Sequence, residues 1–306
     1  MRSVIVWGVV IIGVVAAASW LWTPDKPRES LEARYAAAPS RFVEVAGLRL
    51  HLRETGPPAA PAVILMHGFG ASLHTWEDWA RELETDWRVI RFDLPGAGLT
   101  GPDPAADYRD ERGEQILLAL MDRLGLARAS VVGHSMGGRL AWRFAADHPD
   151  RVTRLVLVAP DGFASPGFEY DKPPEVPAAL ELMRHALPRA LMRMNLEPAY
   201  ADPRALTDET IDRYHDLLLA PGVRGALLDR MKQTRLRDPR PLLARIRAPT
   251  LLIWGEQDAM IPLGNSADYL EAVAGARLVS LPGVGHLPQE ENPGAALQAL
   301  RRFLSE

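Results

Sequence analysis

The 306-residue sequence contains no cysteine. Disulfide bonds, thiolate metal sites and a cysteine nucleophile are therefore excluded. The sequence also has little net charge, −4 at pH 7, and contains no basic cluster with interleaved aromatic residues. A chain of this kind has no broad electrostatic attraction to nucleic acid, so we expect no nucleic-acid partner.

Motifs that bind metals or nucleotides are also absent. The sequence has no H-E-x-x-H pair, no P-loop and no carboxylate-rich calcium loop. One string, Gly96 to Gly101, matches the G-x-G-x-x-G pattern of dinucleotide-binding proteins and follows a predicted strand. It runs into Pro102-Asp103-Pro104, so no helix begins there to bind a pyrophosphate. We therefore expect no cofactor and no metal ion.

Charge is lacking from residues 4–22, an apolar run that contains Trp7, Trp20 and Trp22. A helix needs about 20 apolar residues to cross a bilayer, and tryptophan suits the membrane interface. We predict that residues 1–23 form an N-terminal transmembrane anchor. The alternative is a signal peptide cleaved before Ser19, which would make the protein secreted.

Residues 24–40 are rich in proline, alanine and charge, and we predict a juxtamembrane linker there. Its positive charges, Lys26, Arg28 and Arg34, favour a catalytic domain in the cytoplasm. A short tail ahead of an apolar run is instead typical of an export signal. We adopt the second orientation, a single-pass membrane protein whose catalytic domain faces the periplasm or the exterior.

Apolar strands alternate with helical stretches from residue 41 onward. The expected strands lie at residues 62–66, 88–94, 129–132, 152–159, 250–254 and 276–281. Buried strands separated by helices indicate an α/β fold with a mostly parallel sheet covered on both faces. In such a fold the active residues lie at the carboxyl ends of the strands.

Residues 161–238 break this alternation. They contain several prolines and amphipathic helical runs, but no strand pattern. We predict a helical cap inserted between two strands, so that the core comprises residues 41–160 and 239–306. The apolar residues of the cap suit a lid over an apolar substrate, although such a stripe also fits simple packing.

The run Gly133-His134-Ser135-Met136-Gly137 lies between an apolar strand and a predicted helix. A serine hydroxyl becomes a nucleophile at a strained strand-to-helix turn, where a base takes its proton and backbone N–H groups face the developing oxyanion. Ser135 is therefore the candidate nucleophile. We expect the neighbouring His134 to have a structural or pocket-lining role.

A serine nucleophile needs a general base, and the base needs a group that holds its tautomer and stabilises its charge. Asp258 follows the strand at 250–254, and His286 follows the strand at 276–281. Asp161 also follows a strand end and remains an alternative acid. We expect His67 to brace its loop by hydrogen bonding. The other histidines, including His51 and His74, are expected to be packed or at the surface.

From about residue 41 to residue 304 the chain resembles the α/β-hydrolase family. The motifs that carry the resemblance are His67-Gly68-Phe69-Gly70, Asp93-Leu94-Pro95-Gly96-Ala97-Gly98, Gly133 to Gly138, Gly255-Glu256-Gln257-Asp258, and Gly285-His286 with Glu291-Asn292-Pro293. The resemblance implies Ser135 as nucleophile, Asp258 as triad acid and His286 as general base. It also implies the backbone N–H groups of Phe69 and Met136 as oxyanion-hole donors. With its predicted anchor, the chain is similar to membrane-anchored bacterial lipases and phospholipases.

The function that these residues imply is hydrolysis of carboxylic esters through an acyl-enzyme. We expect an acyl-chain or lipid-like ester substrate at a membrane. One alternative is a carbon–carbon bond hydrolase or a cofactor-free perhydrolase that uses the same triad, and another is a non-catalytic binding protein displayed on a membrane. Dehalogenase and epoxide-hydrolase chemistry is disfavoured, because such relatives carry an aspartate where Ser135 stands.

Overall fold

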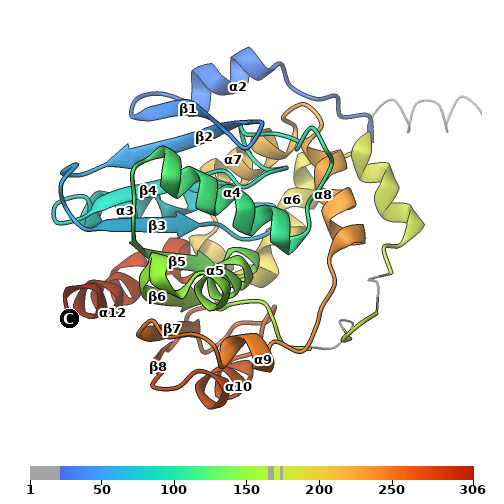
Figure 1. The fold of residues 1–306 in the computed structure, drawn as a ribbon. Helices are drawn as coiled ribbons and strands as arrows, with labels where there is room; N and C mark the ends of the chain where they lie inside the picture. Colours follow the sequence, from blue (N-terminus) through green and yellow to red (C-terminus); the bar gives the residue numbers. More distant parts are fainter. Residues whose placement is uncertain (1–20, 165–168, 173–174) are drawn as a thin grey trace, which may run out of the picture.

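The computed structural model describes residues 21–164, 169–172 and 175–306. Within these residues, eight strands form one sheet in the order β1-β2-β4-β3-β5-β6-β7-β8 (Figure 1). The strands are β1 (Ser40–Val45), β2 (Leu48–Thr55), β3 (Ala62–Met66), β4 (Arg88–Phe92), β5 (Ala129–His134), β6 (Val152–Val158), β7 (Thr250–Gly255) and β8 (Arg277–Leu281). β2 pairs antiparallel with β1 and β4, and the other neighbouring strands run parallel.

Helices cover both faces of the sheet. The helices α3 (Glu77–Leu83) and α12 (Pro293–Ser305) pack on one face, and α4 (Asp110–Arg123), α5 (Met136–Asp147) and α10 (Asn265–Ala272) pack on the other. Successive side chains of a strand point to opposite faces of the sheet. Val63 and Leu65 of β3 therefore pack in the core beneath α3 and α12, whereas Ile64 and Met66 pack in the core beneath α4 and α5. The predicted α/β fold with a mostly parallel sheet is confirmed.

Between β6 and β7, the described residues contain helices and no strand. We name this part of the chain, residues 159–249, the β6–β7 insertion. Its main elements are the short 3-10 helix η3 (Ala178–Arg184), α6 (Arg189–Leu196), α7 (Asp208–Leu218), α8 (Val223–Gln233) and α9 (Arg240–Leu243). The predicted cap, residues 161–238, lies within this insertion, whereas α9 falls in the part predicted as core. The division of the chain into a core and a cap domain stays a prediction.

The segment predicted as a linker, residues 24–40, is packed against the β6–β7 insertion. It contains α2 (Arg28–Tyr35), which Figure 1 shows beside β1 and β2. Leu31 and Tyr35 of this helix are buried in one cluster with apolar residues of α7 and α8. Residues 21–36, which we name the N-terminal arm, are therefore part of the folded body.

The arm and the insertion meet at Asp216 of α7. This buried carboxylate accepts hydrogen bonds from Lys26 Nζ at 2.6 Å, Arg34 Nη1 at 2.7 Å and Tyr35 Oη at 2.9 Å. A buried carboxylate is stable only when its charge is paired and its oxygens are hydrogen-bonded. The arm supplies both.

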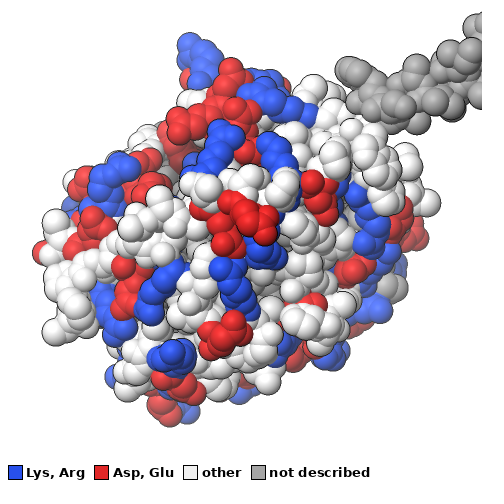
Figure 2. All heavy atoms as spheres, turned by 90° about the horizontal axis from the view of Figure 1, so that it is seen from above, with Lys and Arg blue, Asp and Glu red and all other residues white. Residues whose placement is uncertain are grey.

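Charged side chains of both signs are interspersed on the face drawn in Figure 2, with no region of a single sign. Ion pairs between exposed side chains include Arg81 with Asp78 at 2.9 Å and Arg204 with Asp202 at 2.8 Å. Pairing of this kind leaves a mixed potential over the surface rather than a field that steers a charged polymer.

Candidate active site

Ser135 lies at the junction of β5 and α5 with φ 51° and ψ −117°. This backbone conformation is costly for a residue other than glycine and persists only where surrounding contacts impose it. The two motif glycines permit it. A Cβ at Gly133 would lie 2.2 Å from the Gly137 carbonyl oxygen, and a Cβ at Gly137 would lie 2.4 Å from that of Met66.

His286 and Asp258 form a buried pair. The distance from His286 Nδ1 to Asp258 Oδ2 is 2.7 Å, and Asp258 Oδ1 accepts the backbone N–H groups of Met260 and Ile261, both at 2.8 Å. The carboxylate is therefore held with one oxygen toward the imidazole. Since a carboxylate only accepts, Nδ1 carries the proton and Nε2 is the free acceptor.

Two cavities meet at Ser135. The first, which we name the apolar lobe, has a volume of about 310 Å³ and is lined mainly by apolar side chains of the β6–β7 insertion, including those of Met183, Leu187, Met192, Leu218 and Leu227. The second has a volume of about 250 Å³ and is also lined mainly by apolar side chains, among them Met136. It differs from the first in that its wall includes Arg139, Asp161 and Thr234, and we name it the polar lobe after these three residues. Phe69, Ser135 and His286 line both lobes.

Both predicted oxyanion-hole residues line this site. Met136 is the first residue of α5, so its N–H has no carbonyl partner within the helix, and the helix N-terminus favours negative charge. Phe69 lies in the loop after β3 and is 45% exposed. The structure thus brings Phe69 and Met136 to the same cavity as Ser135, and their role as donors stays a prediction.

The loop that carries Phe69 is held on both sides. His67 Nδ1 donates to the Gly68 carbonyl oxygen at 2.8 Å, and His67 Nε2 accepts the N–H of Leu94 at 2.9 Å. A Cβ at Gly68 would lie 2.8 Å from His134 Nδ1, so only glycine fits against that ring. His67 therefore braces this loop, as the sequence suggested.

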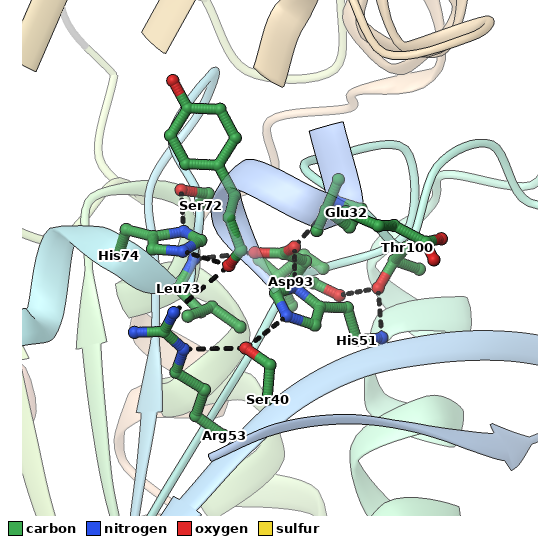
Figure 3. Close-up of polar contacts among 12 residues, drawn as sticks. Glu32, Ser40, His51, Arg53, Ser72, Leu73, His74, Asp93 and Thr100 are labelled. Atoms are coloured by element: carbon green, nitrogen blue, oxygen red, sulfur yellow. Dashed lines mark hydrogen bonds and ion pairs between the residues drawn. The ribbon is translucent and has the colours of Figure 1, made fainter. Parts of the chain in front are cut away.

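A further buried network, centred on Asp93, holds the end of this loop at Leu73 (Figure 3). Asp93 Oδ1 accepts the N–H of Leu73 at 2.7 Å, and Asp93 Oδ2 accepts from His51 Nδ1 at 2.7 Å. His51 Nε2 lies 3.0 Å from Ser40 Oγ, which also accepts from Arg53 at 2.8 Å. This is a second Ser–His–Asp arrangement, but none of its three residues lines either lobe. We assign it a structural role.

His134, beside the nucleophile, is buried and neutral. Its Nε2 donates to the His286 carbonyl oxygen at 2.8 Å. Burial lowers the pKa of His134 well below its ordinary value, and the neighbouring His286 lowers it further. A neutral His134 holds the backbone of His286 without adding a positive charge beside it.

Asp161, the alternative acid, is paired elsewhere. Arg139 Nη1 lies 3.0 Å from Asp161 Oδ2, and Arg139 Nε lies 3.2 Å from Asp110 Oδ1. The imidazole of His286 has Asp258 as its carboxylate partner. The geometry therefore favours Asp258 over Asp161 as the acid of this site.

Three buried histidines predict that stability falls in acid. Burial lowers the pKa of His67, of His134 and of His74, the last to about 3. Each takes up a proton near its ordinary pKa of about 6.5 when the chain unfolds, so the unfolded state binds more protons below that pH. We expect the free energy of unfolding to fall by about 1.4 kcal/mol per pH unit for each histidine below about pH 6, measured by urea unfolding.

The first test variant is His74→Gln. The decrease of the unfolding free energy with falling pH should be less steep in this variant, by the contribution of one histidine, about 1.4 kcal/mol per pH unit. Replacing Gln298, an exposed residue that does not titrate, with alanine should leave the slope unchanged. An unchanged slope in His74→Gln would contradict a neutral, buried His74.

The sequence profile of the alpha/beta hydrolase fold family matches residues 61–293. The chain is 30% identical over 290 residues to a 2-hydroxy-6-oxononadienedioate/2-hydroxy-6-oxononatrienedioate hydrolase of Cupriavidus pinatubonensis, covering 90% of this chain and 98% of that protein. The names of such relatives fit the carbon–carbon hydrolase alternative better than ester hydrolysis.

Solved structures with the same fold include hydrolases of other classes. An enol-lactonase from Burkholderia xenovorans matches with a TM-score of 0.76 and 26% identity, over 87% of this chain and all of that chain. A bacterial membrane phospholipase A matches with a TM-score of 0.75 and 23% identity, over 100% of this chain and 98% of that chain.

The prediction of a single-pass membrane protein, with its catalytic domain outside the cytoplasm, is wrong on two findings. In the part of the chain that the structure describes, no helix is both long enough and apolar enough to cross a bilayer. The chain also matches 98% of a curated protein whose name is that of a hydrolase of a small dienedioate. The predicted span, residues 4–22, lies outside the described residues except for its last two positions.

The fold prediction survives this correction, because the family match covers most of the sheet, both loops that carry Asp258 and His286, and the turn at Ser135. The chain belongs to the alpha/beta hydrolase fold family.

Proposed function

We propose that this protein is a serine hydrolase in which Ser135 is the nucleophile, His286 the general base and Asp258 the acid that orients the base. The observation that carries the proposal is the 2.7 Å contact from His286 Nδ1 to Asp258, with His286 and Ser135 lining the same two lobes. That contact leaves Nε2 as the acceptor that a serine hydroxyl needs.

In this mechanism Ser135 Oγ attacks the substrate carbonyl while His286 Nε2 takes the hydroxyl proton. The backbone N–H groups of Phe69 and Met136 bind the oxyanion, and Asp258 stabilises the imidazolium. His286 then returns the proton to the leaving group, which departs and leaves an acyl group on Ser135. A water molecule, deprotonated by His286, attacks the acyl carbon; the bond to Ser135 Oγ then breaks, His286 returns the proton to that oxygen, and the acid is released.

We propose a carboxylic ester with an apolar acyl group as the substrate. Among the described residues that line the apolar lobe there is no lysine or arginine. The polar lobe contains Arg139, whose charge is already paired with Asp110 and Asp161. A dicarboxylate placed here would lose its hydration without gaining a free cationic partner, which is costly. The likeness to an enol-lactonase also supports an ester, because a lactone is a cyclic ester.

A second candidate is hydrolysis of a carbon–carbon bond next to a ketone. The name of the curated relative from Cupriavidus pinatubonensis supports it. The same machinery would serve, because Ser135 can attack a ketone carbonyl and the leaving carbon then takes the proton from His286. The substrates of the two candidates differ in charge: the ester has an apolar acyl group, whereas a dienedioate carries two carboxylates.

The test compares p-nitrophenyl esters of increasing acyl length with 2-hydroxy-6-oxohepta-2,4-dienoate, using the full chain. Each methylene buried in the apolar lobe contributes about 0.8 kcal/mol, so kcat/KM should rise about fourfold per methylene until the lobe is full. We expect the dienoate to be turned over more slowly than the best ester. Faster turnover of the dienoate would establish the second candidate instead.

A further inference from the structure

The polar lobe presents a carboxylate at a defined position beside the nucleophile. Asp161 donates its backbone N–H to the Ser135 carbonyl oxygen at 3.1 Å, and its own carbonyl oxygen accepts from Trp142 Nε1 at 3.0 Å. The backbone of Asp161 is therefore tied directly to that of Ser135. Asp161 is one of the residues that line the polar lobe, and its side chain is partly exposed.

Asp161 is the accessible member of its ion pair. The Asp161 side chain is 35% exposed, whereas that of Arg139 is 6% exposed. Arg139 also contacts Asp110, so two carboxylates share one guanidinium. Burial alone would lower the pKa of Arg139, but Asp161 and Asp110 raise it, so the guanidinium stays charged. Arg143 Nε also lies 3.9 Å from Asp110 Oδ2, so Asp110 has a second guanidinium nearby. Within the Arg139–Asp161 pair, the carboxylate is the more accessible group.

An aromatic ring lies in the same wall. Phe69 lines the polar lobe and is 45% exposed. A carboxylate and an aromatic ring in one cavity form the combination that attracts organic cations, through charge pairing and through the negative face of the ring. The apolar lobe shares Phe69 with the polar lobe but has no aspartate or glutamate in its described lining.

We propose that the polar lobe binds the alcohol part of the ester and selects alcohols that carry a positive charge, with Asp161 as the specificity-determining residue. This inference rests on the ester hydrolysis proposed above and adds the chemistry of the leaving group. The substrate class is then an ester of an apolar acid with an amino alcohol or a quaternary ammonium alcohol.

The experiment compares butyrylcholine with 3,3-dimethylbutyl butyrate. The two esters have the same shape and acyl group, but a carbon atom replaces the charged nitrogen in the second. We expect kcat/KM to be about tenfold higher for butyrylcholine, the effect of one partly exposed charge contact. In Asp161→Asn the ratio of the two kcat/KM values should fall to near one. Because it is a ratio, a general loss of activity in the variant cancels.

The matched control is Asp78→Asn, which removes an exposed carboxylate that pairs with Arg81 and does not line the polar lobe. Its ratio should equal that of the unaltered protein. A ratio near one in the unaltered protein, or a ratio that Asp161→Asn leaves unchanged, would overturn the inference while ester hydrolysis stands. Failure of the unaltered protein to hydrolyse these two esters and every p-nitrophenyl ester would overturn the proposed function itself. If Asp161→Asn does not fold, the ratio of the two kcat/KM values in the unaltered protein still tests whether the site prefers the cationic alcohol.

Discussion

Replacing Ser135 with alanine is expected to lower kcat for the best p-nitrophenyl ester by about 10⁴-fold to 10⁶-fold. The change removes only the Oγ atom, and the backbone at φ 51° is already imposed by the contacts around the turn. The oxyanion donors and both lobes remain. Steady-state kinetics give kcat, and labelling by a fluorophosphonate, read by intact mass, shows whether the nucleophile is present.

The matched control is Ser130→Ala on the same strand. Ser130 Oγ lies 3.0 Å from Thr153 Oγ1 and does not line either lobe. We expect its kcat to stay within about threefold of the original, as for a substitution away from the reacting atoms. A loss of less than tenfold in Ser135→Ala would remove Ser135 from the mechanism.

The second large effect is expected for Asp258→Asn, with kcat lowered by about 10³-fold to 10⁴-fold. One oxygen at this position accepts two backbone N–H groups, from Met260 and Ile261. Asparagine has a single oxygen, so this oxygen takes that place and the amide nitrogen turns toward His286. The amide then donates to Nδ1, which shifts the proton to Nε2. His286 in that tautomer cannot accept the proton of Ser135.

The pH profile of kcat tests this account of Asp258→Asn, and Glu256→Gln is its control. Glu256 lies in the same loop and accepts from Ser280 at the surface, so we expect kcat to stay within about threefold in the control. A kcat in Asp258→Asn equal to that of Glu256→Gln would show that another group orients His286. Asp161 would then be examined first.

The parts of the fold that could be predicted from the sequence are those whose signal is local. The apolar run at residues 62–66 is buried on both faces and forms β3 with the same bounds. The turn at Ser135 was predictable because its two glycines are needed for steric reasons that any such turn imposes. Asp258 and His286 could be proposed because each follows a strand end, where parallel strands place their loops together.

The remaining contacts depend on partners far apart in the chain. His51 pairs with Asp93, a separation of 42 residues, and nothing near His51 marks it as a partner. The glycine-rich motif that contains Asp93 was the available signal, because Gly98 leaves room for that carboxylate. The membrane prediction rested on the hydropathy of residues 4–22 alone, and all but two of these residues lie outside the described part of the chain.

Hydrophobic composition also did not separate the two substrate classes. The apolar residues of α6, α7 and α8 were visible in the sequence, but their convergence on one cavity beside Ser135 is a property of the fold. The place of Asp161 beside the second lobe depends on backbone contacts with Ser135 and Trp142, which sequence spacing does not reveal.

The contact between the N-terminal arm and α7 determines when the arm can fold during synthesis of the chain. Lys26 and Asp216 are separated by 190 residues, so the arm leaves the ribosome long before its partner helix exists. Until then the apolar side chains of α2 that pack on the insertion lack that cover. Closing a loop of this length is slow relative to local helix formation. The arm, translated before α7 and α8, therefore cannot reach its native place until these two helices have been synthesised.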